Sequence, residues 1–191
     1  MKKLMFMLAT VACAVCLQAA TIDWQYTSTY LRIGDTTNTK VADDTVAYLI
    51  TTAFSQADAV AAFAANGSSA DVLSAAGTAL YTGTGSFASG KIAEAHSTGS
   101  SADVTAYFVV FNGDNMFLSS AVAAEVDPLN TAVSSIAFSD AASVSKALPQ
   151  QATAGFSGAG WYAAAASVPE PTSGLLMLVG LGALALRRRR A

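Results

Sequence analysis

Cysteine and histidine are scarce in this sequence, and their scarcity argues against several kinds of site. The chain of 191 residues has two cysteines, Cys13 and Cys16, and one histidine, His96. Both cysteines lie in an apolar N-terminal segment that we expect to be removed, so the mature chain would have no disulfide and no thiol nucleophile. A single histidine argues against a zinc site, which usually combines several histidines and cysteines. We expect His96, in a polar Ser/Gly-rich stretch, to be a solvated loop residue.

Basic residues are rare between the two ends of the chain. Residues 21–167 contain four basic and twelve acidic residues, which gives this part a net charge of −8. Binding to nucleic acid or to anionic lipid needs a basic surface, so neither is expected. An acidic surface keeps an exported protein soluble. Calcium binding is a more specific explanation of the acidic residues than solubility, although the D-x-[DN]-x-[DN]-G loop of an EF-hand is absent.

Complete serine-hydrolase motifs are also missing. Residues 155–159 (GFSGA) lack the final glycine of a nucleophile elbow. Ser143 and Lys146 match the S-x-x-K spacing, which places a serine beside a lysine one helical turn further on. The companion motifs S-D-N and K-T-G are absent, so this match is weak.

Acidic pairs and aromatic residues offer two other kinds of site, and both have simpler explanations. Paired carboxylates hydrolyse glycosides only when the fold sets them across a cleft. We expect the pairs Asp43–Asp44 and Glu125/Asp127 to lie in surface turns instead. Trp24 and Trp161 would stack on sugars if exposed, but we expect them in the core. The sequence therefore predicts no catalytic residues, no metal site, no cofactor and no enzymatic activity.

The N-terminus has the pattern of a secretory signal peptide. Lys2 and Lys3 form a positive start, residues 4–17 are apolar, and Gln18 precedes two alanines. This order predicts export through the secretion translocon and removal of residues 1–20 by signal peptidase.

The C-terminus combines three features in a fixed order. Pro169, Glu170 and Pro171 come first. Both prolines favour an extended backbone, which is the conformation that a peptidase binds. Residues 172–186 carry no charge and would form a helix of about 22 Å, short for a bilayer core of about 30 Å. Four arginines follow at 187–190, and the positive-inside rule keeps them cytoplasmic. We predict a short transmembrane helix over 172–186 that leaves the preceding chain outside the inner membrane.

This C-terminal arrangement closely resembles the PEP-CTERM sorting signal, whose tail is also called the ice-binding protein C-terminal domain. The resemblance covers residues 168–191. It implies processing by an exosortase, a membrane cysteine peptidase, and delivery to the surface or matrix of a Gram-negative bacterium. It also implies that Pro169, Glu170 and Pro171 are the recognition motif. The implied membrane-retention cluster consists of Arg187, Arg188, Arg189 and Arg190.

The remaining part, residues 21–167, has the length of one domain and reads as β-rich. Alternating or β-branched segments predict strands at 22–26, 45–51, 78–82, 104–111, 116–118, 133–138 and 161–165. Ser55 and Asp58 form a capping box for a helix that ends at Gly67, and a second short helix is expected over 71–76. Residues 83–90 read as a loop, 112–115 as a hairpin turn, and 139–146 as one or two helical turns. We predict a β-rich α+β domain, with an antiparallel sheet or a β-sandwich and one or two short helices.

The functional prediction is an exported, non-enzymatic protein of the cell surface or extracellular matrix. Its expected partners are an exosortase, the secretion translocon, signal peptidase and, transiently, the inner membrane. Two alternatives stay open: a carbohydrate-binding or adhesive module, with exopolysaccharide as its partner, and a secreted hydrolase that uses acids or Ser143.

Overall fold

The computed structural model describes residues 20–27, 29–33, 39–99, 104–124 and 134–164. The cysteines, almost all of the expected signal peptide, the Pro-Glu-Pro motif, the expected helix over 172–186 and the arginine cluster lie outside these ranges. Among the helices within them, none is long and apolar enough to cross a membrane.

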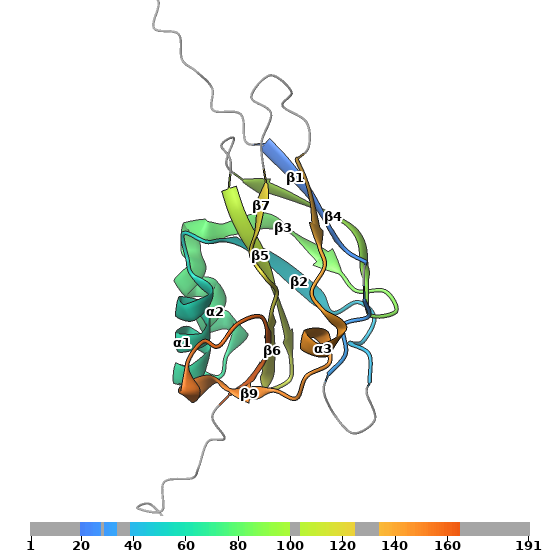
Figure 1. The fold of residues 1–191 in the computed structure, drawn as a ribbon. Helices are drawn as coiled ribbons and strands as arrows, with labels where there is room; N and C mark the ends of the chain where they lie inside the picture. Colours follow the sequence, from blue (N-terminus) through green and yellow to red (C-terminus); the bar gives the residue numbers. More distant parts are fainter. Residues whose placement is uncertain (1–19, 28, 34–38, 100–103, 125–133, 165–191) are drawn as a thin grey trace, which may run out of the picture.

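Within the described ranges, ten strands form one curled sheet (Figure 1). In chain order they are β1 (Ala20–Tyr26), β2 (Val46–Thr51), β3 (Leu80–Ser86), β4 (Ile92–Gly99), β5 (Val104–Asn112), β6 (Asn115–Leu118), β7 (Val122–Ala124), β8 (Ser134–Phe138), β9 (Gln150–Gln151) and β10 (Gly160–Ala163). Their order across the sheet is β8-β1-β4-β3-β2-β5-β6-β10-β9, and β7 pairs with β5.

The sheet is mixed, because two of its neighbouring pairs are parallel. β1 runs parallel to β8 on one side and antiparallel to β4 on the other, and β9 runs parallel to β10. The β-rich prediction is confirmed, but the described strands form a single mixed sheet in place of the expected antiparallel sheet or sandwich. Parallel pairing joins segments far apart in the chain, and no local turn pattern indicates it.

Three short α-helices and two 3-10 turns complete the described structure: α1 (Gln56–Asn66), α2 (Ser69–Ala76), α3 (Ala142–Ser145), η1 (Gly77–Ala79) and η2 (Ala152–Ala154). The predicted capping box of α1 is confirmed: Ser55 Oγ accepts from the Asp58 N–H, and the Asp58 carboxylate accepts from the Ser55 N–H. α1 ends at Gly67, whose φ of 66° is left-handed, as expected for a glycine at this position.

Two apolar layers lie on opposite faces of the sheet, and β5 contributes to both. Ala106, Phe108 and Val110 point into the layer enclosed by the curl, where Phe108 lies 5.9 Å from Trp24 between ring centroids. Tyr107 and Val109 point into the layer covered by α1 and α2. A strand buried on both faces explains the continuous apolar run at 106–111.

The predicted loop at 83–90 is wrong in its first half. Residues 83–86 belong to β3, and β4, which follows it, was not predicted. Gly83 has a φ of +108°, and a Cβ placed on it would lie 2.3 Å from the carbonyl oxygen of His96 on β4. Glycine is therefore needed here because the two backbones approach closely, and not because the segment is a loop.

Candidate functional site

A group of polar side chains lies on the outward face of β1 and β4. In β1, Trp24 points into the enclosed core, so Asp23 points the other way. In the antiparallel pairing, Asp23 lies directly opposite His96 of β4, and Trp24 lies opposite the buried Ala95. The alternation of the two strands therefore places Asp23 and His96 side by side on one surface.

Glu94 is the third member of this group, and it lies at a β-bulge of β4. Trp24 pairs with Ala95 but Tyr26 pairs with Ile92, so β4 has one extra residue between the two pairs. Ile92 and Ala95 both stay buried, and the intervening Ala93 and Glu94 are both exposed. Glu94 points outward beside Asp23 and His96 because it alternates with the buried Ala95, and the bulge keeps Ile92 buried as well.

The three side chains form a compact polar cluster. His96 Nδ1 lies 2.6 Å from Asp23 Oδ1. A ring nitrogen of His96 and one carboxylate oxygen from each of Asp23 and Glu94 all lie within 4.8 Å of one another. The hydrogen bond to Asp23 and the charges of Asp23 and Glu94 raise the pKa of His96 above its usual value. The side chain of His96 is 62% exposed, whereas that of Asp23 is 19% exposed. A shallow hollow of about 240 Å³ beside the cluster is lined by Asp23, Gln25, Glu94 and Ser135, among others.

His96 is therefore exposed, as expected, but the prediction that it lies in a loop is wrong. It belongs to β4, and its ring is held by a carboxylate 73 residues away in the chain. The signal that sequence reasoning missed is the alternation of Glu94, His96 and Thr98, which marks the polar face of a strand.

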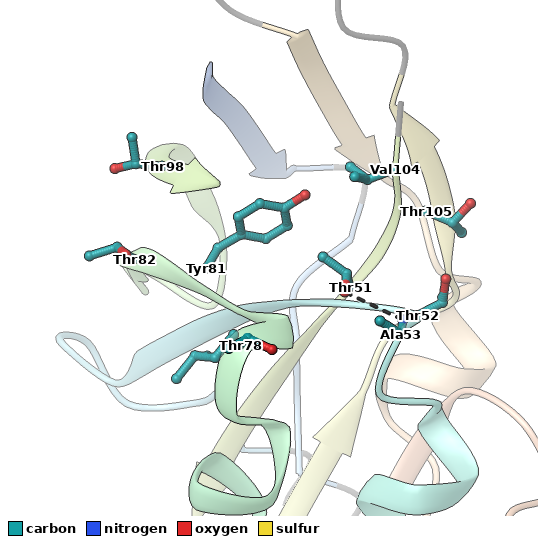
Figure 2. A pocket seen from close by; sticks show the side chains of 10 residues that line it. Thr51, Thr52, Ala53, Thr78, Tyr81, Thr82, Thr98, Val104 and Thr105 are labelled. Atoms are coloured by element: carbon teal, nitrogen blue, oxygen red, sulfur yellow. Dashed lines mark hydrogen bonds between the residues drawn. The ribbon is translucent and has the colours of Figure 1, made fainter. Parts of the chain in front are cut away.

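A second hollow, of about 570 Å³, lies where β2, β3, β4 and β5 meet (Figure 2). Six threonines line it: Thr51, Thr52, Thr78, Thr82, Thr98 and Thr105. Each threonine hydroxyl both donates and accepts hydrogen bonds, so the wall offers many neutral polar groups and no charge.

Tyr81 gives this threonine-lined hollow a buried polar group. Its ring lies at the centre of the view in Figure 2, with the hydroxyl directed toward Val104. Tyr81 is 5% exposed, and its hydroxyl has no hydrogen-bond partner in the part of the chain that the structure describes. Burial raises the pKa of Tyr81, so the hydroxyl stays protonated and able to donate.

Three of the four basic residues of the body gather around one exposed tyrosine. Lys40 Nζ and Lys91 Nζ lie 4.1 and 4.8 Å from the centre of the Tyr30 ring, and Arg32 Cζ lies 5.8 Å from it. These distances are within the range of cation–π attraction, which favours a cation over the face of an aromatic ring.

The remaining candidate residues have structural explanations where the structure describes them. Trp24 and Trp161 are buried in the core, as predicted. Ser143 and Lys146 are both exposed at the one-turn helix α3. Asp43 accepts a hydrogen bond from the Ser89 N–H at 2.6 Å and lies in an exposed turn with Asp44. Glu125 and Asp127 lie outside the described residues.

The GFSGA segment does not form a nucleophile elbow. It lies between η2 and β10, whereas the elbow joins a strand to a helix. The Ser157 hydroxyl hydrogen-bonds to the Gln150 side chain, and the Ser157 N–H donates to the Tyr162 hydroxyl at 3.1 Å. Ser157 is thus part of a loop that is tied to the end of the sheet.

Comparison with known proteins identifies one region of the chain. Residues 167–190 match the family model described as the PEP-CTERM protein-sorting motif. The predicted PEP-CTERM resemblance is therefore confirmed, and the motif implies a protein sorted through an exosortase, at the membrane, to the cell surface. No curated protein and no solved structure matches the chain.

Proposed function

We propose that this protein is an exosortase substrate of a Gram-negative bacterium whose body acts, without enzymatic activity, at the cell surface or in the extracellular matrix. In this proposal the secretion translocon exports the chain and signal peptidase removes residues 1–20. The helix over 172–186 and the arginines at 187–190 hold the intermediate in the inner membrane. Exosortase then cuts near Pro169, Glu170 and Pro171. The observation that carries the proposal is the sorting-motif match over 167–190.

The position of the motif relative to the folded body supports this order of events. β10 ends at Ala163, six residues before Pro169. An extended chain covers about 3.5 Å per residue, so the motif is connected to the last strand by at most ~20 Å of backbone. Because the motif follows the last strand of the described sheet, cleavage there would not require that strand to be cut.

Replacing both prolines of the motif tests the sorting step. Pro169→Ala combined with Pro171→Ala should leave the chain, with its C-terminal tail still attached, in the inner-membrane fraction of a host that has an exosortase. Pro149→Ala, a proline change in the body, is the matched control and should be processed normally. Mass spectrometry of both ends of the protein gives the readout. Normal release of the double variant to the surface would refute recognition through this motif.

Carbohydrate binding is the second candidate function, and the threonine-lined hollow favours it. Its volume of about 570 Å³ falls in the usual range for small-molecule sites, about 300–1,000 Å³. A wall of threonine hydroxyls without charge suits a neutral ligand rich in hydroxyls.

A glycan array probed with the full chain tests this second function. Thr82→Val removes one exposed hydroxyl from the wall of the hollow and should weaken any binding that the native protein shows. Thr84→Val makes the same chemical change on β3 at an exposed residue that does not line the hollow, and it serves as the control. If no neutral glycan binds the native chain, or if both variants bind equally well, the hollow is not a sugar site.

A further inference from the structure

We propose that Asp23, Glu94 and His96 bind a divalent transition-metal ion on the outward face of β1 and β4. This inference goes beyond the sorting function and does not depend on it. It rests on the convergence of three ligand-bearing side chains on two adjacent strands of the sheet.

The donor set suits a borderline metal ion such as Zn²⁺. It consists of one imidazole nitrogen and two carboxylate oxygens, and zinc accepts both kinds of ligand at about 2.0–2.2 Å. Around a tetrahedral ion, ligand atoms are separated by about 3.3 Å. The donor atoms here lie within 4.8 Å of one another, and the Asp23–His96 pair is at 2.6 Å. Binding would require the Asp23–His96 pair to open and the wider pairs to close toward this spacing, with the ion in place of the shared proton and water as a fourth ligand.

The backbone that carries these side chains is held on both sides. β1 is an interior strand between β8 and β4, and β4 lies between β1 and β3. Directly beneath the cluster, the buried Trp24 indole N–H donates to Ser97 Oγ at 3.0 Å and ties β1 to β4. Ligands on such strands are positioned more accurately than ligands on loops.

The electrostatics around the cluster also favour a cation. In the part of the chain that the structure describes, no lysine or arginine forms an ion pair with Asp23 or Glu94. The body as a whole is acidic, with four basic and twelve acidic residues over 21–167. In this negative field, two adjacent carboxylates attract a divalent cation more strongly than one carboxylate alone would.

The test uses His96 as a reporter, because it is the only histidine in the chain. The full chain in detergent, labelled with ¹⁵N, is titrated with ZnCl₂ while NMR follows the two ring nitrogens. We expect one ring nitrogen to shift in a saturable manner with one equivalent of zinc. CaCl₂ should leave both nitrogens unchanged, because calcium takes oxygen ligands. A response to calcium equal to that to zinc would overturn the assignment.

Variants separate a three-ligand site from a lone histidine that binds zinc. Asp23→Asn and Glu94→Gln should each weaken zinc binding by about tenfold or more, since even loss of a supporting residue costs ~10-fold. Asp71→Asn changes an exposed carboxylate on α2 and should leave the titration as in the native chain. Tryptophan fluorescence confirms that each variant is folded. If zinc fails to shift the His96 nitrogens, or if all three variants bind as tightly as the native chain, the proposal is wrong.

Discussion

Trp24 and Ser97 form a buried side-chain hydrogen bond across β1 and β4, with a distance of 3.0 Å between Nε1 and Oγ. Trp24 and Ser97 are each 1% exposed. The Ser97 hydroxyl, which accepts from Trp24, donates a second hydrogen bond to the Gly83 carbonyl oxygen of β3 at 3.3 Å. This one hydroxyl therefore connects three neighbouring strands.

Ser97→Ala should destabilise the protein more than an ordinary surface substitution. The change leaves the Trp24 indole N–H buried without a partner, which costs about 1–3 kcal/mol in the free energy of unfolding. Urea denaturation measures this difference. Ser143→Ala, at an exposed serine, is the control and should change the free energy by less than about 0.5 kcal/mol. Equal effects of the two changes would mean that the hydrogen bond contributes nothing.

Gly83→Ala should disrupt the contact between β3 and β4. The added Cβ meets the His96 carbonyl oxygen at 2.3 Å, and the φ of +108° is unfavourable for any residue with a side chain. We expect a loss on the order of 3 kcal/mol or more, from backbone strain and steric overlap together. Gly113→Ala is the matched control: its φ of +57° is also positive, but a Cβ there meets no atom within 4 Å. It should cost only about 1 kcal/mol, and thermal denaturation of both variants would reveal the difference.

Ser55→Ala should remove the N-cap of α1. The Ser55 hydroxyl oxygen accepts a hydrogen bond from the Asp58 N–H at 3.1 Å. Loss of such a cap costs about 1 kcal/mol in the free energy of unfolding. Ser74→Ala lies in α2 at an exposed position and should be neutral or slightly stabilising, because alanine is the better helix former. A Ser55→Ala variant as stable as Ser74→Ala would contradict the capping role.

The stability of the body should fall above about pH 10, the usual pKa of tyrosine. Burial raises the pKa of Tyr26, Tyr81 and Tyr107 in the folded chain. The unfolded chain therefore loses these protons first, and stability that is fully present below pH 10 is lost as the pH rises further.

Tyr107→Phe isolates one contributor to this alkaline loss. Each such tyrosine adds a slope of about 1.4 kcal/mol per pH unit between its unfolded and folded pKa values. Urea denaturation at a series of pH values should show a smaller slope for Tyr107→Phe than for the native chain. The variant also loses the hydrogen bond from the Tyr107 hydroxyl to the Phe54 carbonyl at 2.9 Å, so only the slope is compared. An unchanged slope would contradict the contribution of Tyr107.

The features that the sequence predicts well are those specified by neighbouring residues. Ser55, Asp58 and Gly67 mark both ends of α1 within thirteen positions. The hairpin of β5 and β6 follows from an apolar run, a turn at 112–115 and a second apolar run, and Gly113 takes the left-handed conformation with a φ of 57°. The sorting motif is likewise a contiguous pattern, and it is confirmed over 167–190.

The features that the sequence does not predict depend on pairing at long range. β4 reads as polar because alanine and serine fill two of its inward positions, Ala95 and Ser97. These small residues suffice because Trp24 and Phe108 fill the space on the core side. The cluster of Asp23 with His96 requires the β1–β4 register, which cannot be read from the residues alone.

The described chain begins and ends at opposite ends of the body (Figure 1). Ala20 lies opposite Gly99, whereas the Ala164 N–H donates to the Asp114 carbonyl in the turn between β5 and β6. In the membrane-held intermediate proposed above, the described part of the body nearest to the tail along the chain would therefore be the part beside this turn. The opposite end of the body, at Ala20, would then be free to meet neighbouring molecules before exosortase cuts the tail.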